Sequence, residues 1–333
     1  MSQTTGQRRR GKGRGGEQAM VPEAEFTSYY GRPIVKPSPW EADIPAYLFS
    51  GGLAAGSSLL AAGGDLTGRP ALRRTGRLGA LVALAFSMVA LVHDLGRPAR
   101  FLNMLRTVKL TSPMSVGTWI LSTYGPFAGA AAAAEVVDLL PVDRRRMPWR
   151  LLSLAGRPAG VVAALTAPPV AAYTAVLLAD TATPSWHAAY KELPFVFTAS
   201  AAAASGGLAM LGAPTDQAGP ARRLAVGGAA VELFAEWRME RSMGITAEPL
   251  HEGRAGTLMR ASRVLTVAGA AGALLGGRSR TVSALSGLAL MAGSACTRFG
   301  VFEAGQASAR DPKYTVVPQR ERLDRGEPVR YQG

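Results

Sequence analysis

Five stretches of the sequence contain no charged residue over a length close to that of a membrane-spanning helix. They are residues 44–64, 110–134, 158–179, 193–215 and 281–297. A helix needs roughly 20 mainly apolar residues to cross the hydrocarbon core of a bilayer. The sequence therefore predicts an all-α, polytopic membrane protein.

The apolar pattern along the whole chain predicts about eight transmembrane helices, which we expect to form two four-helix bundles. Their predicted bounds are 44–64, 78–93, 113–139, 158–179, 194–213, 224–238, 263–277 and 281–302. The sixth segment carries two glutamates and the seventh is short, so these two are the least regular of the eight. An even number of crossings places both ends of the chain on one side of the membrane.

Three regions follow from this pattern. Residues 1–43 form a basic N-terminal arm, expected to be disordered, together with the approach to the first helix. The arm has no apolar region of the kind that follows the charged start of a signal peptide. Residues 44–302 form the transmembrane helical domain, and residues 303–333 form a polar C-terminal tail.

The formal net charge of +14 raises the question of nucleic-acid binding. The basic residues lie in the tails and between apolar runs, as in the group Arg69, Arg73, Arg74 and Arg77, which we expect to occupy a loop. This distribution is typical of loops that flank membrane helices, and a lipid bilayer is the expected partner instead of nucleic acid.

The cysteine and histidine content limits the cofactors that the chain itself can hold. Cys296 is the only cysteine, so the chain forms no internal disulfide and supplies no set of thiolates for an iron–sulfur cluster. Its three histidines lie in separate boundary regions, so the paired ligands of a b-type haem are missing. We expect no metal site, no haem and no cluster of the chain's own.

The sequence His93-Asp94-Leu95-Gly96-Arg97-Pro98 stands where the second helix leaves the membrane. An imidazole at this boundary can exchange a proton with a quinone oxygen, and a carboxylate can pass that proton onward. Arg97 and the nearby Arg100 are candidates for partner docking or for holding the loop. A structural alternative is that Asp94 and Arg97 pair at the helix end while His93 lies among lipid headgroups.

Tyr173 lies inside the apolar fourth helix, where its hydroxyl requires a hydrogen-bond partner. A quinone carbonyl is one candidate partner. A backbone carbonyl of a neighbouring helix is the other.

Two carboxylates fall within the predicted sixth helix. Glu232 and Glu236 are four residues apart and therefore share one helix face. Ionisable groups in a membrane segment are costly and suggest a function, here a candidate proton path. A pair with Arg238, or a position at the membrane interface, would also explain them. Near the end of the last helix, Arg298 and Glu303 are expected to be snorkelling helix ends.

Four blocks of sequence carry a resemblance to a known family: residues 40–56, residues 93–98 with 112–119, residues 173–186, and residues 298–312. The block HDLGRP followed by SPMSVGTW is the most specific of them. In these blocks the chain resembles the NrfD/PsrC family, the membrane subunits of polysulfide reductase-type respiratory complexes.

The resemblance implies a subunit of the cell (cytoplasmic) membrane that binds menaquinone or another quinone and contains no metal. It implies a four-cluster ferredoxin-like iron–sulfur partner and a molybdopterin catalytic subunit that carries out the substrate chemistry. The matching polar residues for quinone binding and proton transfer are His93, Asp94, Tyr173, Tyr47 and Asp43.

Two other functions remain open from the residues. Glu232, Glu236 and the Gly- and Pro-rich helices are compatible with a proton-coupled transporter. A passive membrane anchor, which docks an iron–sulfur subunit without quinone chemistry, is the second alternative.

Overall fold

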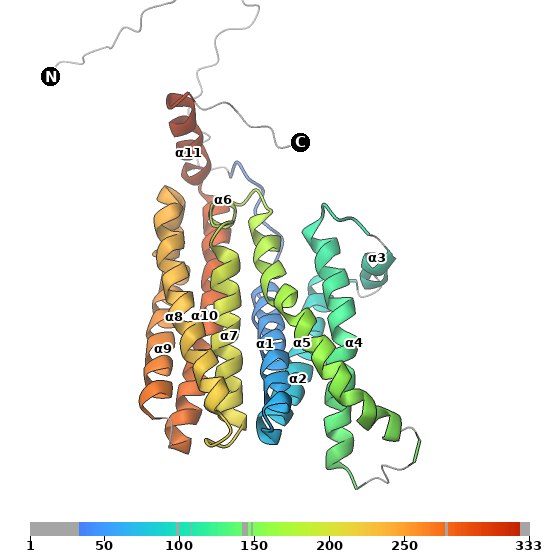
Figure 1. Cartoon of the computed structure of the whole chain (residues 1–333). Helices are drawn as coiled ribbons and strands as arrows, with labels where there is room; N and C mark the ends of the chain where they lie inside the picture. Colours follow the sequence, from blue (N-terminus) through green and yellow to red (C-terminus); the bar gives the residue numbers. More distant parts are fainter. Residues whose placement is uncertain are drawn as a thin grey trace, which may run out of the picture. The chain divides into compact units, whose positions relative to one another are not determined.

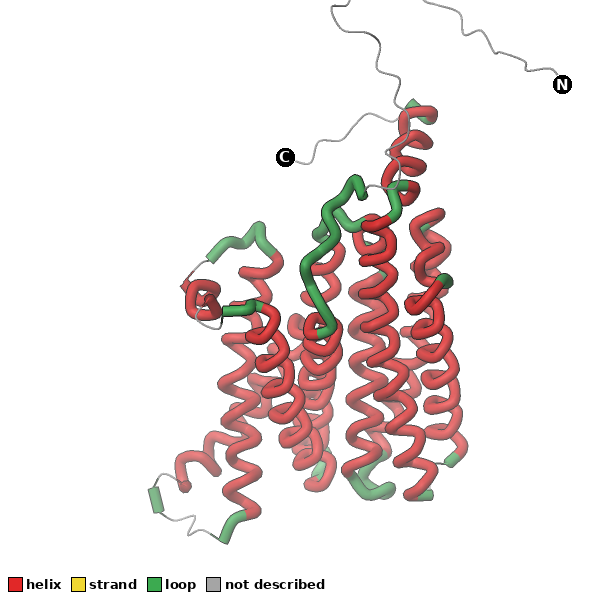
Figure 2. The backbone as a smooth tube through the Cα atoms, turned by 180° about the vertical axis from the view of Figure 1, so that it is seen from behind, coloured by secondary structure: helices red, strands yellow, loops and turns green. Residues whose placement is uncertain are grey.

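The computed structural model describes residues 33–97, 100–106, 108–141, 146–147, 149–276 and 279–326. Throughout this part of the chain the regular structure is helical, and Figure 2 shows helices joined by loops. The helices are α1 Asp43–Leu66, α2 Pro70–Asp94, α3 Arg100–Arg106, α4 Pro113–Leu139, α5 Trp149–Ala179, α6 Pro184–Ala188, α7 Leu193–Gly212, α8 Gly219–Ser242, η1 Gly244–Leu250, α9 Gly253–Leu275, α10 Arg280–Arg310 and α11 Lys313–Asp324. The predicted all-α, polytopic fold is confirmed. The predicted N-terminal arm lies mostly outside the described residues.

Among the described residues, seven helices are long and apolar enough to cross a membrane: α1, α2, α4, α5, α7, α9 and α10. The remaining long helix, α8, corresponds to the predicted sixth crossing. Its 24 residues are long enough to span a bilayer, but its mean hydropathy is lowered by several charged side chains. It packs closely on α7, since a Cβ added at Gly228 would lie 2.6 Å from the backbone nitrogen of Ala203.

The eight long helices pack as two groups of four, shown side by side in Figure 1. The first bundle contains α1, α2, α4 and α5, and the second contains α7, α8, α9 and α10. Helix α7 joins them because it packs on α1 and α5 as well as on α8 and α10. At one crossing the backbones of Gly207 and Gly287 are in direct contact, which only residues without a side chain permit.

The segment before α1 and the end of α10 lie together. The side-chain amide of Gln306 donates to the carbonyl oxygens of Ser38 and Trp40, at 3.1 Å each. The ring of Trp40 stacks on Trp186, with 6.0 Å between centroids. The chain therefore enters the first bundle and leaves the second at the same end, as an even number of crossings requires.

Five helices are at least eight residues longer than predicted: α2, α5, α8, α9 and α10. Helix α2 begins at Pro70 instead of residue 78, so Arg73, Arg74 and Arg77 lie in the helix and the prediction of a loop there was wrong. Arg73 and Arg77 form ion pairs with Glu135 of α4 and Asp65 of α1. A helix predicted from its charge-free residues alone is too short when its charged residues are neutralised by other helices.

Helix α10 extends eight residues beyond its predicted end, residue 302, to Arg310. Arg298 is therefore not a snorkelling helix end. It lies about 18 Å from the end of α10, at 1.5 Å of rise per residue, and is 1% exposed. This buried position contradicts the interpretation made from its spacing to Glu303.

Candidate functional site

The predicted quinone residues come from three helices of the first bundle. Asp43 and Tyr47 lie in the first turns of α1, His93 and Asp94 end α2, and Tyr173 lies near the end of α5. Because α1 and α2 are antiparallel neighbours, the start of one lies against the end of the other. Nδ1 of His93 is 2.7 Å from Oδ2 of Asp43, a distance at which the imidazole donates to the carboxylate. His93 itself faces outward and is exposed.

Tyr47, Asp94 and Tyr173 line a single narrow cavity together with residues of α4. Its volume is about 40 Å³, room for about one water molecule. Tyr173 fits against α4 because residue 117 is glycine: a Cβ at Gly117 would overlap the tyrosine ring. Three helices thus place two phenol rings and a carboxylate on one cavity wall, and the sequence block around Gly117 contributes the space.

A much larger groove opens on the other side of Tyr173, and we call it the Tyr173 groove. Its volume is about 740 Å³, and its lining is Leu110, Thr111, Pro113, Val116, Tyr173, Val176, Ala179, Asp180, His187 and Tyr190. The ring of His187 stacks on that of Tyr190, and its Nδ1 lies 3.1 Å from the carbonyl oxygen of Ala179. His187, Asp180 and Tyr190 were not among the site residues predicted from the sequence. Their position just beyond an apolar helix that carries a tyrosine near its end is the signal that would have found them.

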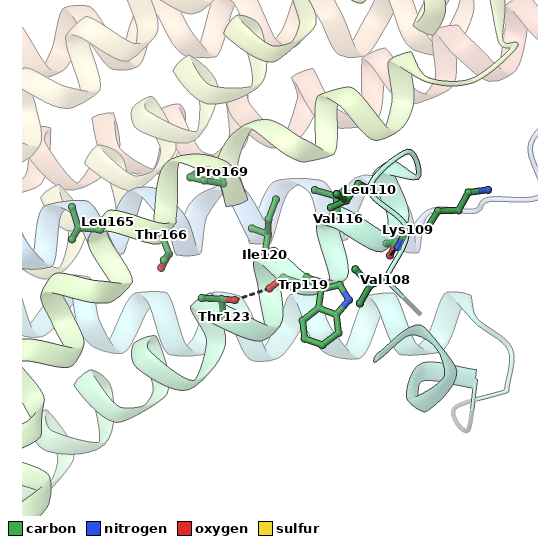
Figure 3. Close-up of a pocket in the computed structure, with 11 residues that line it drawn as sticks. Val108, Lys109, Leu110, Val116, Trp119, Ile120, Thr123, Leu165, Thr166 and Pro169 are labelled. Atoms are coloured by element: carbon green, nitrogen blue, oxygen red, sulfur yellow. Dashed lines mark hydrogen bonds between the residues drawn. The ribbon is translucent and has the colours of Figure 1, made fainter. Parts of the chain in front are cut away.

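A third depression, the α4–α5 groove, is mainly apolar and opens between these two helices (Figure 3). Its volume is about 500 Å³. Trp119 and Ile120 of α4 and Leu165 and Pro169 of α5 line it, as Figure 3 shows. Leu110 and Val116 line both this groove and the Tyr173 groove. An apolar surface therefore continues from the outer face of α4 and α5 to Tyr173.

The predicted docking residues follow the end of α2. Gly96 has a φ of +65°, which turns the chain sharply and leaves Arg97 exposed. Arg100 begins α3, but its side chain lies outside the described residues. A docking role for the two arginines stays a prediction.

The structure does not bring Glu232 and Glu236 to this site. Both lie on α8 in the second bundle, and both are buried. Glu236 pairs with Arg263 of α9, whose Nε is 3.4 Å from Oε2. Arg238 instead pairs with Glu192, so the alternative that a pair with Arg238 explains Glu232 and Glu236 was wrong.

In the described residues, no group of three or more His, Cys, Asp or Glu side chains has an arrangement that could hold a metal ion. Cys296 is half-buried in α10 and has no disulfide partner. The polar groups that line the narrow cavity and the Tyr173 groove include hydroxyls, the carboxylates of Asp94 and Asp180 and, in the groove, the imidazole of His187. These are hydrogen-bonding and proton-exchanging groups, which suit an organic ligand with carbonyl or hydroxyl oxygens.

Comparison with known protein families finds a match to the family described as "Polysulphide reductase, NrfD" over residues 34–214. The match covers more than half of the chain, from the segment before α1 to the loop after α7, and includes all five residues predicted for quinone binding. No curated protein matches the chain. The extent of the family match shows that the chain belongs to the polysulphide reductase NrfD family.

Proposed function

We propose that the protein is the quinone-binding subunit of a respiratory oxidoreductase complex in the cell membrane. It would exchange electrons between menaquinone, or a similar quinone, and an iron–sulfur partner. Membership of the family and the membrane-spanning helices support this proposal. The single observation that carries the site is the position of Tyr173, which lines both the narrow cavity with Tyr47 and Asp94 and the large Tyr173 groove.

The volumes indicate where a ring would bind. The cavity of about 40 Å³ is too small for a quinone ring, whereas the Tyr173 groove falls within the usual 300–1,000 Å³ range of ligand pockets. The headgroup would therefore lie in the groove with Tyr173 as hydrogen-bond donor. The isoprenoid tail would follow the shared wall at Leu110 and Val116 into the α4–α5 groove.

A quinone takes up two electrons and two protons when it is reduced to a quinol. Asp94 lies on the cavity wall behind Tyr173, and the His93–Asp43 pair stands beside it at the exposed end of α2. These groups can hold and pass protons between the aqueous surface and the Tyr173 hydroxyl. His93 therefore serves proton exchange and does not need to touch the ligand.

The electron partner must be another chain, because one cysteine cannot ligate a cluster. We propose a four-cluster ferredoxin-like subunit, with a molybdopterin subunit beyond it, docked at the end of the molecule that bears Arg97, the beginning of α3 at Arg100, the beginning of α1 and the end of α10. We propose a transmembrane domain of residues 44–302. Residues 1–43 precede it in the sequence and residues 303–333 follow it, and both would extend the docking face.

The test is quinone-linked electron transfer in the purified complex. Tyr173→Phe removes one hydroxyl and should lower the rate about tenfold, the effect of one hydrogen bond worth roughly 1.4 kcal/mol in the transition state. His93→Ala should slow the reaction most at alkaline pH, where protons are scarce.

Tyr124→Phe is the matched control. The Tyr124 hydroxyl is 2.7 Å from that of Ser58 and donates to the carbonyl oxygen of Ala54 within the bundle, so its loss should not change the rate. Normal turnover in Tyr173→Phe and His93→Ala would refute the site. A complex that docks its iron–sulfur partner but retains no quinone on gentle purification would identify a passive anchor.

A further inference from the structure

Helix α8 carries a third carboxylate on the same face as Glu232 and Glu236, the two that were selected from the sequence. Glu232, Glu236 and Glu240 follow one another at four-residue intervals and therefore lie along one face of the helix. The exposed fraction falls along this series, from 19% for the Glu240 side chain to 2% for Glu236 and 1% for Glu232. We call these three residues the carboxylate ladder.

The ladder begins at the protein surface. Oε2 of Glu240 is 3.7 Å from Nε2 of His251, whose side chain is half exposed just beyond η1. Arg263 of α9 pairs with both Glu240 and Glu236. A guanidinium does not release its proton in proteins, so Arg263 acts as a fixed cation that holds the two carboxylates close to each other.

The ladder ends near the middle of α8. Glu232 is about 20 Å from the beginning of α8 and about 15 Å from its end, at 1.5 Å of rise per residue. Its Oε1 accepts a hydrogen bond of 2.8 Å from Thr297, whose hydroxyl is 2.6 Å from that of Ser262. The Ser200 hydroxyl of α7 also interacts with this carboxylate, but Oε2 of Glu232 has no partner at hydrogen-bond geometry among the described residues, and neither has Oε1 of Glu236.

A second buried group is directed into the same place. Arg298 of α10 is 1% exposed and interacts electrostatically with both Glu232 and Glu236. Its Nη2 donates to the carbonyl oxygen of Phe197 at 2.6 Å and its guanidinium lies over the Phe197 ring, while Nε and Nη1 lack a hydrogen-bond partner in the described part of the chain. Buried polar atoms of a carboxylate and a guanidinium are seldom left unpaired, because each costs desolvation free energy.

The charges around the ladder do not balance. The groups that face it are Arg263 from α9 and Arg298 from α10, with His251 at the outer end only, and α7 carries no charged residue. Three carboxylates thus face two permanent cations. Uptake of one proton would make the buried group neutral, which a low-dielectric interior strongly favours.

From this geometry we propose that the carboxylate ladder binds one proton and exchanges it with water on the side of the chain termini, through Glu240 and His251. In the exchange a hydronium ion gives its proton to a carboxylate and remains as water, and no other bond changes. The ladder forms an access path from one side to the middle of α8. This inference does not rest on the quinone site, which lies in the other bundle.

The experiment uses the full chain in phospholipid vesicles, with the pH of the two compartments set separately. Dicyclohexylcarbodiimide couples to protonated carboxyls in apolar surroundings, and mass spectrometry locates and quantifies the product. We expect labelling at Glu232 or Glu236. Its yield should follow the pH on the side of the termini, falling about tenfold for each pH unit above the pKa of the carboxyl. Protease access to α11 identifies that side.

Glu135 is the internal control, since it is equally buried but held by three arginines, and it should stay unlabelled. Glu240→Gln combined with His251→Ala should delay the response of labelling to a pH jump on the terminal side. Four results would each overturn the proposal: no labelling of the folded protein at acidic pH, equal labelling of Glu135, a yield that follows the opposite compartment, or protection by Na⁺ at constant pH. None of them bears on quinone-linked electron transfer, so failure here leaves the proposed function intact.

Discussion

Two buried glutamates in the two bundles are equally removed from solvent but differ in their partners. Glu135 of α4 contacts the guanidinium groups of Arg73, Arg77 at 3.1 Å and Arg74 at 3.8 Å, all from α2. Glu232 of α8 accepts one bond from a threonine hydroxyl, and its second oxygen has no partner at hydrogen-bond geometry among the described residues. The neighbouring Asp65 adds to the first cluster by pairing with Arg73, Arg77 and Arg157.

Glu135 and Glu232 are equally buried, so the difference between their clusters is the ratio of arginines to carboxylates. Around Glu135, four arginines face two carboxylates, and these ion pairs join α1, α2, α4 and α5. Around Glu232, carboxylates outnumber arginines. A cluster in which arginines neutralise every carboxylate stabilises the fold, whereas a cluster with an excess of carboxylates is suited to binding a proton.

The largest expected effect tests this contrast directly. Glu135→Gln removes the charge that neutralises the buried Arg77, and we expect a loss of roughly 3 kcal/mol, the lower part of the range for breaking a buried ion pair. Arg73 and Arg74 keep some access to water, which limits the cost. Denaturant unfolding in detergent measures the change.

Glu232→Gln is the matched variant. It keeps a carbonyl oxygen for the hydroxyl of Thr297, and Arg298 keeps Glu236, so it should cost less than about 1 kcal/mol. Equal losses for Glu135→Gln and Glu232→Gln would remove the distinction between the two clusters.

A second prediction, of intermediate size, separates the quinone site from the carboxylate ladder. Gly117→Ala places a methyl group against the ring of Tyr173, so the ring must move. Overpacking of this kind costs roughly 1–3 kcal/mol. Quinone-linked electron transfer should fall, while carbodiimide labelling of the ladder should stay at its original level.

Gly129→Ala is the control for this change. Gly129 lies on the same helix, and no atom lies within 4 Å of its added Cβ. Replacing it should leave activity unchanged and stabilise the helix slightly, because alanine favours helix. A fall in ladder labelling with Gly117→Ala would mean that the two bundles are coupled, which the contact of Arg298 with Gly52 of α1 would then explain.

The smallest expected effect comes from an ion pair in water, which completes the comparison. Nζ of Lys313, at the beginning of α11, is 2.8 Å from Oε2 of Glu248. Hydrogen bonding to Lys313 holds the pKa of Glu248 below its usual value, and the same bond, helped by Tyr314, raises the pKa of Lys313. Both side chains are nearly half exposed to solvent, so the ion pair contributes little to stability.

The pH dependence has a definite sign. The contribution of Glu248 is present above its unfolded pKa and lost as pH falls through its lowered folded pKa. The contribution of Lys313 is present below its unfolded pKa and lost as pH rises through its raised folded pKa. Limited proteolysis of α11 should therefore be slowest between these limits, and Lys313→Ala should remove this dependence, whereas Arg320→Ala on the same helix should not. An unchanged pH profile in Lys313→Ala would show that the pair does not hold α11.

Much of the fold could be predicted from local sequence, and the misses have one physical cause. Charge-free runs located the long helices. The charged residues of α8 made that crossing the least regular in the sequence, and they also lower its hydropathy, so it is not among the seven apolar spans. Helix α2 was predicted too short because Arg73 and Arg77 are neutralised by Glu135, about sixty residues away in sequence. No local window contains that information.

The candidate site likewise contains residues that could be predicted from the sequence and residues that only the fold brings to it. Resemblance to the family selected Tyr47, Asp94 and Tyr173, which the fold brings to one cavity, and Asp43, which it places on His93. Asp180, His187 and Tyr190 of the Tyr173 groove lie between the end of α5 and the beginning of α7, and they were missed because nothing in their own sequence shows that they face α4. Glu240 was missed because it lies beyond the predicted end of its helix.

The sequence by itself determined that the chain is a bundle of membrane helices, and that it has one cysteine and three histidines far apart in the sequence. Apolar length and residue type are local properties, so both can be read without the fold. The tertiary structure decided which charges are neutralised and which are not. It assigned three arginines to Glu135 and left Glu232 with a threonine and a shared arginine. Pairing energies depend on distances between helices, and those distances are set only when the bundles pack.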